Sequence, residues 1–287
     1  MPSTPEPIPP AFPDAVCPDD LAALNSISGG VQCSRCGRKF EARDGVIELL
    51  PRETFEQSSP ESVQLQAYGA SFSRRQAQGF YQRLGAGLAI LGNGYLYSWA
   101  GRALEAFAAG GNLAVLDAAC GDGLLRRYLS SRHRHTGVDF SLRPLLRANR
   151  NYPSTYFRAD LRHLPFPGHR FPAAVCLQAL QYLDQPQSAL AQIARVLQPG
   201  GRLLLSVPNC WSVKYRLLGL PAIQVQRFDR AAIISLLSRD FEILQLRTQG
   251  LWVPAPKVSL HLPGVYRENL GLSWTIVAAP KKSPALS

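Results

Sequence analysis

The stretch from residue 112 to residue 129, NLAVLDAACGDGLLRRYL, decides the fold. Its apolar run 113–116 is typical of a buried parallel strand, which Asp117 ends. The turn 118–123 consists largely of small residues, and a helix is expected from Leu124, with apolar side chains at 124, 125, 128 and 129. Such a turn lets a ligand lie directly against the backbone, while the start of the helix offers unpaired N–H groups. The segment therefore predicts a strand, a ligand-binding turn and a helix.

Two further acidic positions follow strand-like segments. A second strand is expected to end at Asp139, which lies 22 residues beyond Asp117, and a third strand at 154–158 is followed by Asp160 and Leu161. A carboxylate at the end of the second strand of such a unit is placed to accept hydrogen bonds from both hydroxyls of a ribose. The pattern favours a nucleoside-containing ligand.

The rest of the chain continues the alternation of strands and helices. Strands are expected at 173–177, 202–207, 241–248 and 274–279, and helices at 188–197 and 230–238, with Asp229 as a polar helix start. The sequence Pro-Gly-Gly at 199–201 indicates a helix stop followed by re-entry into a strand. This order predicts a doubly wound α/β sheet.

Composition places the chain among globular proteins. It has 287 residues, of which 46% are hydrophobic and 18% charged, enough for one large domain and a small appendage. Residues 1–15 predict a proline-rich disordered tail without a targeting pattern, so a cytoplasmic protein is expected. Residues 1–61 hold 5 Lys and Arg against 10 Asp and Glu, whereas the remainder holds 26 against 10. A basic body of this kind can attract RNA, an anionic membrane face or an anionic small substrate.

Residues 16–52 have the residue spacing of a zinc ribbon in which one ligand is replaced. Cys33 and Cys36 form a C-x-x-C knuckle, and Cys17 begins a first knuckle whose second cysteine is replaced by Asp20. Structural zinc is mostly held by four Cys or by Cys and His, although a site with three Cys and Asp20 as fourth ligand is chemically feasible. The alternative is a degenerate ribbon without metal that folds on a small core of its own, formed by Phe40, Val46, Ile47 and Leu49.

At residues 65–282 the chain resembles the class I S-adenosylmethionine-dependent methyltransferases. VLDAACGDG, HTGVDFS, FRADLRHLPF and RVLQPGGRLLLSVP are similar to four motifs of that family, in order. The resemblance implies a seven-stranded Rossmann-like sheet with an antiparallel last strand at 111–282, preceded by a helical cap or linker at 53–110. It also implies that S-adenosylmethionine is held by Asp117, Ala119, Cys120, Gly121, Gly123, Asp139, Phe140, Asp160, Leu161 and Gln178.

Two positions depart from the family pattern. Ala119 replaces the usual first glycine of the turn, and Pro172 replaces an aspartate that commonly precedes the fourth strand. Alanine adds only a methyl group beside the ligand, so binding is still expected. A nicotinamide enzyme is disfavoured, because Arg126 stands where the third glycine of G-x-G-x-x-G would be.

A ribbon fused to this body is similar to two kinds of relatives: ribosomal-RNA guanine methyltransferases with an N-terminal zinc ribbon, and methyltransferases of the menaquinone/ubiquinone type. An acidic ribbon with Asp20 would repel a phosphate backbone, which favours a small-molecule acceptor. We therefore expect methyl transfer to a small, lipophilic or aromatic, quinone- or phenol-like acceptor. The alternatives are an rRNA base methyltransferase and a non-catalytic methyltransferase-like accessory or binding protein.

The sequence does not assign a catalytic base. Tyr182, His163 and His261 are weak candidates, because each can hydrogen-bond or exchange a proton. Segments 62–109 and 210–226 are candidates for a lid over the site. The second of these mixes apolar and basic residues, which also suits contact with a membrane surface.

Overall fold

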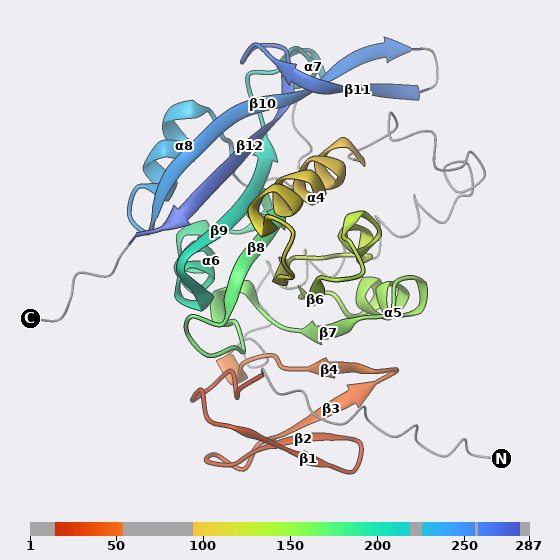
Figure 1. Cartoon of the computed structure of the whole chain (residues 1–287), viewed down its shortest axis with the longest axis vertical. Helices are drawn as coiled ribbons and strands as arrows, with labels where there is room; N and C mark the ends of the chain where they lie inside the picture. The colour runs from red at the N-terminus through yellow and green to blue at the C-terminus, as the bar shows by residue number, and fades with distance from the viewer. Residues whose placement is uncertain (1–14, 54–93, 219–225, 256–257, 282–287) are drawn as a thin grey trace, which may run out of the picture.

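The predicted strand before the glycine turn is β5 (Ala114–Ala118), near the middle of a long twisted sheet (Figure 1). The computed structural model describes residues 15–53, 94–218, 226–255 and 258–281. The other strands in these ranges are β1 (Leu24–Ile27), β2 (Gly30–Cys33), β3 (Lys39–Arg43), β4 (Val46–Glu48), β6 (Arg134–Asp139), β7 (Thr155–Arg158), β8 (Phe171–Leu177), β9 (Leu197–Pro208), β10 (Phe241–Ala255), β11 (Val258–Tyr266) and β12 (Gly271–Pro280). The helices are α4 (Gly94–Ala108), α5 (Leu142–Asn151), α6 (Pro186–Val196), α7 (Val213–Leu218) and α8 (Arg230–Leu237), with 3-10 helices η1 (Leu124–Tyr128), η2 (Leu161–His163) and η3 (Leu180–Tyr182).

The order of the seven middle strands is β7-β6-β5-β8-β9-β12-β10. Strands β7 to β9 pair in parallel, so that Asp117 of β5 lies opposite Gly137 of β6 and Val175 of β8. Strand β12 pairs antiparallel with both β9 and β10. The expectation of a doubly wound, seven-stranded sheet with an antiparallel last strand is confirmed.

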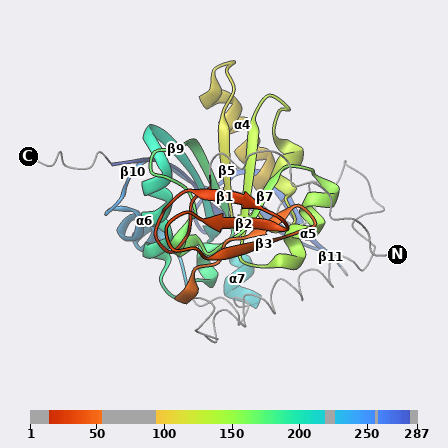
Figure 2. The same ribbon diagram turned by 90° about the horizontal axis from the view of Figure 1, so that it is seen from below.

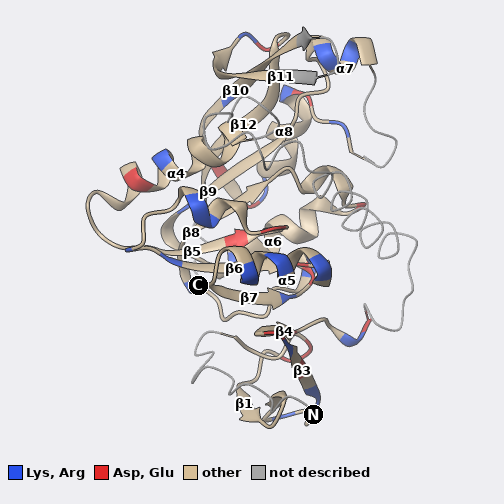
Figure 3. Cartoon of the chain, turned by 90° about the vertical axis from the view of Figure 1, so that its right-hand side faces the viewer, with Lys and Arg blue, Asp and Glu red and all other residues tan. Residues whose placement is uncertain are grey.

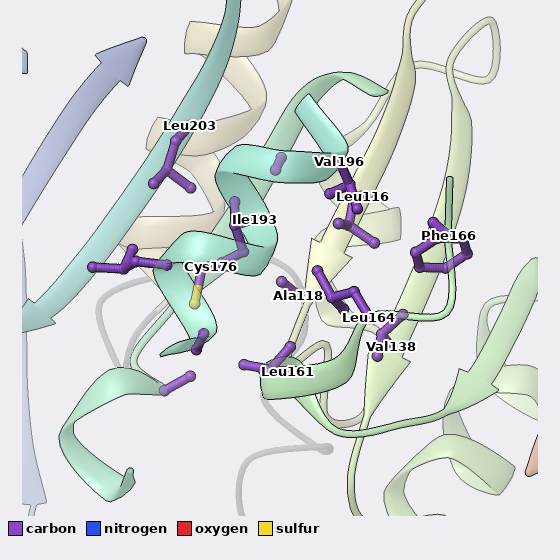
Figure 4. Packing of buried hydrophobic residues seen from close by; sticks show 14 of the residues in the cluster. Leu116, Ala118, Val138, Leu161, Leu164, Phe166, Cys176, Ile193, Val196 and Leu203 are labelled. Carbon is purple, nitrogen blue, oxygen red and sulfur yellow. The ribbon is translucent and has the colours of Figure 1, made fainter. Parts of the chain in front are cut away.

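Helices cover both faces of this sheet, and the alternation of side chains along β5 determines which residue faces which helix. Leu116 and Ala118 belong to a buried cluster with Ile193 and Val196 of α6, as Figure 4 shows. Val115, one position along the strand, packs on the other face in a cluster with residues of α4. Because both faces are covered, the strands between them are nearly continuous apolar runs.

The ribbon joins the sheet as an extension of its edge. Strand β4 pairs in parallel with β7, Glu48 lies opposite Arg158, and the backbone N–H of Leu49 donates to the carbonyl oxygen of Arg158 at 2.7 Å. Figure 2, seen from below, shows the ribbon strands lying across this end of the molecule.

The ribbon shares the core of the larger domain. Phe40, Ile47 and Leu49 lie in the same buried cluster as Phe157 of β7, whereas Val46 packs with residues of α5. A ribbon that folds on a separate core of Phe40, Val46, Ile47 and Leu49 is therefore not what the structure shows, because β4 is short and its apolar side chains reach the domain beside it.

At the opposite edge, β10 and β11 form a hairpin that the sequence did not predict. Strand β10 continues beyond Leu251, which pairs with Gly271 at the start of β12, and its last residues pair with β11 alone. The register shifts between Gln249 and Leu251, and Gly250 between them has a φ of 77°. A Cβ at Gly250 would lie 2.5 Å from Cζ of Tyr95 in α4. The glycine therefore permits the strand to bend closely over α4.

Other elements differ from expectation in length or type. The helix expected from Leu124 is the five-residue 3-10 helix η1. Strand β9 already starts at Leu197, so residues 199–201 lie within it. Helix α8 begins as expected, because Asp229 caps it by accepting from the N–H of Ala232 at 2.8 Å. Residues 1–14 of the predicted tail 1–15 lie outside the described ranges. So do residues 54–93 of the predicted cap or linker 53–110.

None of the helices in the described part of the chain combines the length and the hydropathy needed to cross a bilayer.

Candidate functional site

The carboxyl ends of the parallel strands bring the predicted site residues to one edge of the sheet. Asp117 is the second-to-last residue of β5, Asp139 ends β6, Asp160 follows β7, and Gln178 follows β8. Because these strands are adjacent and parallel, the four side chains come from neighbouring positions along that edge. In doubly wound sheets, ligands bind in the crevice outside these strand ends.

The loop after β5 has the backbone expected of a ligand-binding turn. Ala119, Gly121 and Gly123 have φ values of 64°, 52° and 70°, in the left-handed region that favours glycine. A Cβ at Gly121 would meet nothing within 4 Å, whereas one at Gly123 would lie 2.6 Å from the hydroxyl of Tyr156. Gly121 thus borders open space, and Gly123 is required by packing. Cys120, which directly precedes Gly121, is buried.

Asp139, the last residue of β6, hydrogen-bonds to this loop. Its Oδ2 accepts from the N–H of Gly121 and its Oδ1 from the N–H of Ser141, both at 2.8 Å. Removal from water raises the pKa of Asp139 to about 6, with the two backbone hydrogen bonds opposing the rise and Asp117 adding to it. The carboxylate is therefore held in place by backbone groups while titrating near neutrality.

Phe140 and Asp160 are both held by arginines. The carbonyl oxygen of Phe140 accepts from Nε of Arg158 at 3.0 Å, and the Arg158 guanidinium lies 6.0 Å from the centre of the Phe140 ring. Asp160 accepts from the backbone N–H of Arg162 at 2.8 Å and from its guanidinium at 2.7 Å. Leu161, which follows, is buried. The charge of Asp160 is thus balanced by Arg162, and the apolar side chain of Leu161 is the group suited to a flat ring.

A buried network behind Asp117 was missed by sequence reasoning. Oδ2 of Asp117 lies 3.2 Å from Nε2 of His135, and Nδ1 of His135 lies 3.0 Å from the hydroxyl of Ser154, which donates to the carbonyl oxygen of His135 at 2.7 Å. Only 3% of Asp117 and 4% of His135 are exposed. His135 lies on β6, next to β5, two residues before the register partner of Asp117. A buried polar residue in a strand is the one signal that could have indicated this partner.

Gln178 is held at the end of β8 by serines of β9 and β12. It has a φ of 56°, and its Nε2 donates to the hydroxyls of Ser206 in β9 at 3.3 Å and Ser273 in β12 at 3.4 Å. Its carbonyl oxygen accepts from Nε2 of the buried Gln181 at 2.9 Å. Non-glycine residues in this backbone region concentrate at functional sites.

The three candidate bases lie on different elements. His163 ends η2, Tyr182 ends η3, and His261 lies in β11. The structure brings His261 against Lys214 of α7, with Nε2 and Nζ 3.2 Å apart. His163 and Tyr182 are half-buried, whereas His261 is buried with 7% of its surface exposed.

The ribbon gathers the four predicted metal ligands. One ligand atom from each of Cys17, Asp20, Cys33 and Cys36 lies within 4.8 Å of all the others. Sγ of Cys17 is 3.8 Å from Sγ of Cys36, and Sγ of Cys33 is 3.4 Å from Oδ1 of Asp20. The N–H groups of Arg35 and Cys36 both donate to Sγ of Cys33 at 3.3 Å, which favours a thiolate there. Three thiols and one carboxylate in this arrangement fit a four-coordinate zinc ion.

The segment after β9 carries exposed apolar side chains. Leu217 and Leu218 at the end of α7 are 70% and 64% exposed, and Trp211 just before the helix is 55% exposed. Figure 3 shows basic residues on this helix and along α5. A lid role or a membrane-facing role for the segment stays a prediction.

Comparison with known proteins agrees with this geometry. Residues 116–205, which run from β5 to β9, match the family described as methyltransferase domain. Over 103 residues the chain is 35% identical to the ubiquinone biosynthesis O-methyltransferase of Dechloromonas aromatica, covering 33% of this chain and 44% of that protein. Over 95 residues it is 37% identical to the demethylmenaquinone methyltransferase of Chlamydia trachomatis, covering 31% of this chain and 42% of that protein. The chain thus spans less than half the length of these relatives.

Solved structures share the fold at low sequence identity. A SAM-dependent methyltransferase of Thermotoga maritima, described as a possible histamine N-methyltransferase, aligns over 76% of this chain and all of its own, with a TM-score of 0.54 and 16% identity. Magnesium protoporphyrin IX methyltransferase of Synechocystis PCC 6803, solved with bound SAM, aligns over 78% of this chain and 99% of its own, with a TM-score of 0.52 and 16% identity.

Proposed function

We propose that this chain, which carries a methyltransferase domain with the class I fold, binds S-adenosylmethionine and transfers its methyl group to a small quinone- or phenol-like acceptor. When bound, S-adenosylmethionine supplies a methyl group activated by a positively charged sulfur. The chain's own task is to hold the two reactants in line and to exclude water, since positioning accounts for much of the rate enhancement of such displacements.

The observation that carries the cofactor proposal is the link from Asp139 to the N–H of Gly121. It places a carboxylate at the end of β6 directly beside the loop at the end of β5. In our proposal the carboxylate accepts from the ribose hydroxyls, and Asp117, braced by His135, faces the methionine part. Leu161 would pack on the adenine, and Gln178 would lie near the sulfur.

The acceptor proposal is supported by the relatives and by the charge distribution. The two similar proteins named above are a ubiquinone and a demethylmenaquinone methyltransferase. The first 61 residues of the sequence carry twice as many acidic as basic residues, and a segment with that charge disfavours a nucleic-acid backbone. We therefore place a small aromatic acceptor ahead of an RNA base.

We also propose that the ribbon holds a structural zinc ion through Cys17, Asp20, Cys33 and Cys36. The donor set is closed by four protein ligands, which is typical of structural rather than catalytic zinc. The ion would stabilise the ribbon and would take no part in methyl transfer.

Titration calorimetry, followed by an acceptor screen, tests the function. The wild-type chain should bind S-adenosylmethionine and should then transfer a radiolabelled methyl group to a member of a quinone and phenol panel in preference to rRNA. Salt-sensitive methylation of rRNA would instead favour the RNA alternative. Cofactor binding with no transfer to either panel would leave a methyltransferase-like binding protein.

A further inference from the structure

The hairpin β10–β11 and helix α7 meet beyond the carboxyl ends of the central strands, above α4 (Figure 1). Trp252 and His261 are register partners in the part of the hairpin that extends past β12. The bend at Gly250 presses the hairpin onto Tyr95 of α4. As a result, the ring of His261 lies edge-on to that of Tyr95, with centroids 6.3 Å apart.

Lys214 of α7 meets His261 at this junction, with their nitrogens 3.2 Å apart. An ammonium and an imidazolium are both only donors, so a hydrogen bond between these nitrogens requires that one of them has a free lone pair. Burial lowers the pKa of Lys214 from its ordinary value, which is consistent with a shared proton. At the Lys214–His261 contact, one nitrogen therefore has a basic lone pair and the other carries a positive charge that is half-buried.

A chain of contacts connects this pair to the proposed methyl-donor edge. The hydroxyl of Tyr95 is 2.9 Å from the hydroxyl of Ser273, to which Nε2 of Gln178 donates at 3.4 Å. On the other side, Nζ of Lys214 lies 5.7 Å from the centre of the Tyr215 ring. Burial, together with a smaller contribution from Tyr182 of η3, raises the pKa of Tyr215 to about 12. Tyr95 thus lies beside His261, and Tyr215 lies beside Lys214.

We propose that Lys214 and His261 form the acceptor-binding pair of the methyl-transfer site, and that they receive an acidic hydroxyl of a phenol- or enol-type acceptor. This inference rests on the proposed function and names the chemical class of its second substrate. The aromatic rings of Tyr95 and Tyr215 would flank the acceptor ring, while the nitrogens take its hydroxyl. Neutral acceptors without an acidic hydroxyl would lack this interaction.

The pair also accounts for the proton that methylation of a hydroxyl releases. As the acceptor oxygen forms its bond to the methyl carbon, the sulfur–methyl bond breaks and its electron pair stays on sulfur. The hydroxyl proton passes to whichever nitrogen of Lys214 and His261 is neutral, the hydrogen bond between the two nitrogens opens, and the positive charge beside it stabilises the oxygen as it becomes anionic. Product release then returns that proton to water.

Binding of 4-nitrophenol tests the inference without a known acceptor, because the ionised form of this probe absorbs visible light. Full-length protein saturated with S-adenosylhomocysteine is titrated at a pH at which the free probe is mostly protonated. We expect the wild type to bind the probe as its phenolate. Lys214→Met and His261→Gln should each weaken binding by roughly tenfold or more, because a charge-assisted hydrogen bond is lost, and should abolish the phenolate signal.

Lys39→Met is the matched control, because Lys39 is an exposed lysine of β3 in the ribbon. It should bind the probe as the wild type does. Calorimetry with S-adenosylhomocysteine and thermal unfolding check that both test variants keep the cofactor site and the fold. The inference would be overturned if the wild type binds S-adenosylhomocysteine but gives no phenolate signal. It would also be overturned if the phenolate signal survives in both variants. A wild type that binds no S-adenosylhomocysteine would instead overturn the proposed function.

Discussion

Glu48 of β4 and Arg158 of β7 form an ion pair across the boundary between the ribbon and the larger domain, with Oε2 and Nη1 2.5 Å apart. Only 9% of the Glu48 side chain and 15% of the Arg158 side chain are exposed. Through its Nε, Arg158 also donates to the carbonyl oxygen of Phe140, next to Asp139. The ribbon is thereby connected, through one side chain, to the loop that we assign to the ribose.

We expect Glu48→Gln to lower the free energy of unfolding by about 2–4 kcal/mol, because it leaves the largely buried Arg158 without its charge partner. Urea denaturation measures the change. Glu41→Gln, which removes an exposed carboxylate of β3 that pairs with Arg43, should change stability by no more than about 0.5 kcal/mol. Equal effects of the two substitutions would show that the pair across the boundary is not stabilising.

The zinc proposal predicts one bound ion per chain in protein purified without chelator, measured by elemental analysis. Cys33→Ser should lose the ion and lower the melting temperature, because metal binding is coupled to folding of the ribbon. Asp20→Cys should retain the ion more tightly against a competing chelator, since it completes a four-cysteine site. Metal-free wild-type protein with an unchanged melting temperature would contradict the proposal.

Asp139 predicts a pH dependence of cofactor binding. Its pKa is raised to about 6, and only the ionised carboxylate accepts hydrogen bonds from both ribose hydroxyls with full strength. Calorimetric affinity for S-adenosylmethionine should therefore fall as the pH is lowered through about 6. Asp139→Asn should bind more weakly and with little change over the same range; a wild-type affinity that stays constant down to pH of about 5 would speak against this role.

The raised pKa of Asp139 also makes the stability of the cofactor-free protein depend on pH, but in the opposite direction: stability falls as the pH rises. The native state holds the Asp139 proton more tightly than the unfolded chain, whose carboxyl has a pKa of about 4. This contribution to stability is fully present below pH of about 4 and is lost as the pH rises through about 6. Asp139→Asn should remove that loss, which urea denaturation at several pH values can measure.

Ala119 has a left-handed backbone, which costs a residue with a Cβ roughly 1–2 kcal/mol. After allowing for the greater freedom of glycine in the unfolded chain, we expect Ala119→Gly to raise the free energy of unfolding by about 0.5–1 kcal/mol. Ala118→Gly, at the fully buried last position of β5, should lower it instead by about 1 kcal/mol or more. If both substitutions destabilise equally, strain at Ala119 is not a feature of the native loop.

The sequence predicts the central fold well because its signals are local. The apolar run before Asp117, the turn with Gly121 and Gly123, and the acidic end of β6 each define structure within a few residues. The cluster of Cys17, Asp20, Cys33 and Cys36 in the ribbon was also predictable, since Cys33 and Cys36 form a recognised spacing and Cys17 precedes them by one hairpin.

The remaining features depend on contacts between distant parts of the chain. Strand β4 is too short for its sequence to predict the parallel pairing with β7. That pairing includes the contact of Glu48 with Arg158, 110 positions later. The hairpin β10–β11 depends on a register shift at Gly250, and the Lys214–His261 contact spans 47 positions. Periodicity in the sequence carries no record of such pairings.

Calorimetric titration of the full-length chain with S-adenosylmethionine, in parallel with Asp139→Ala, tests the central claim most directly. We predict one site per chain with micromolar affinity, or roughly −8 kcal/mol, in the wild type, and loss of most of that affinity in the variant. A folded wild-type protein that gives no heat of binding at any concentration, or an Asp139→Ala variant that binds equally well, would contradict the assignment of the cofactor site to the carboxyl ends of β5 and β6.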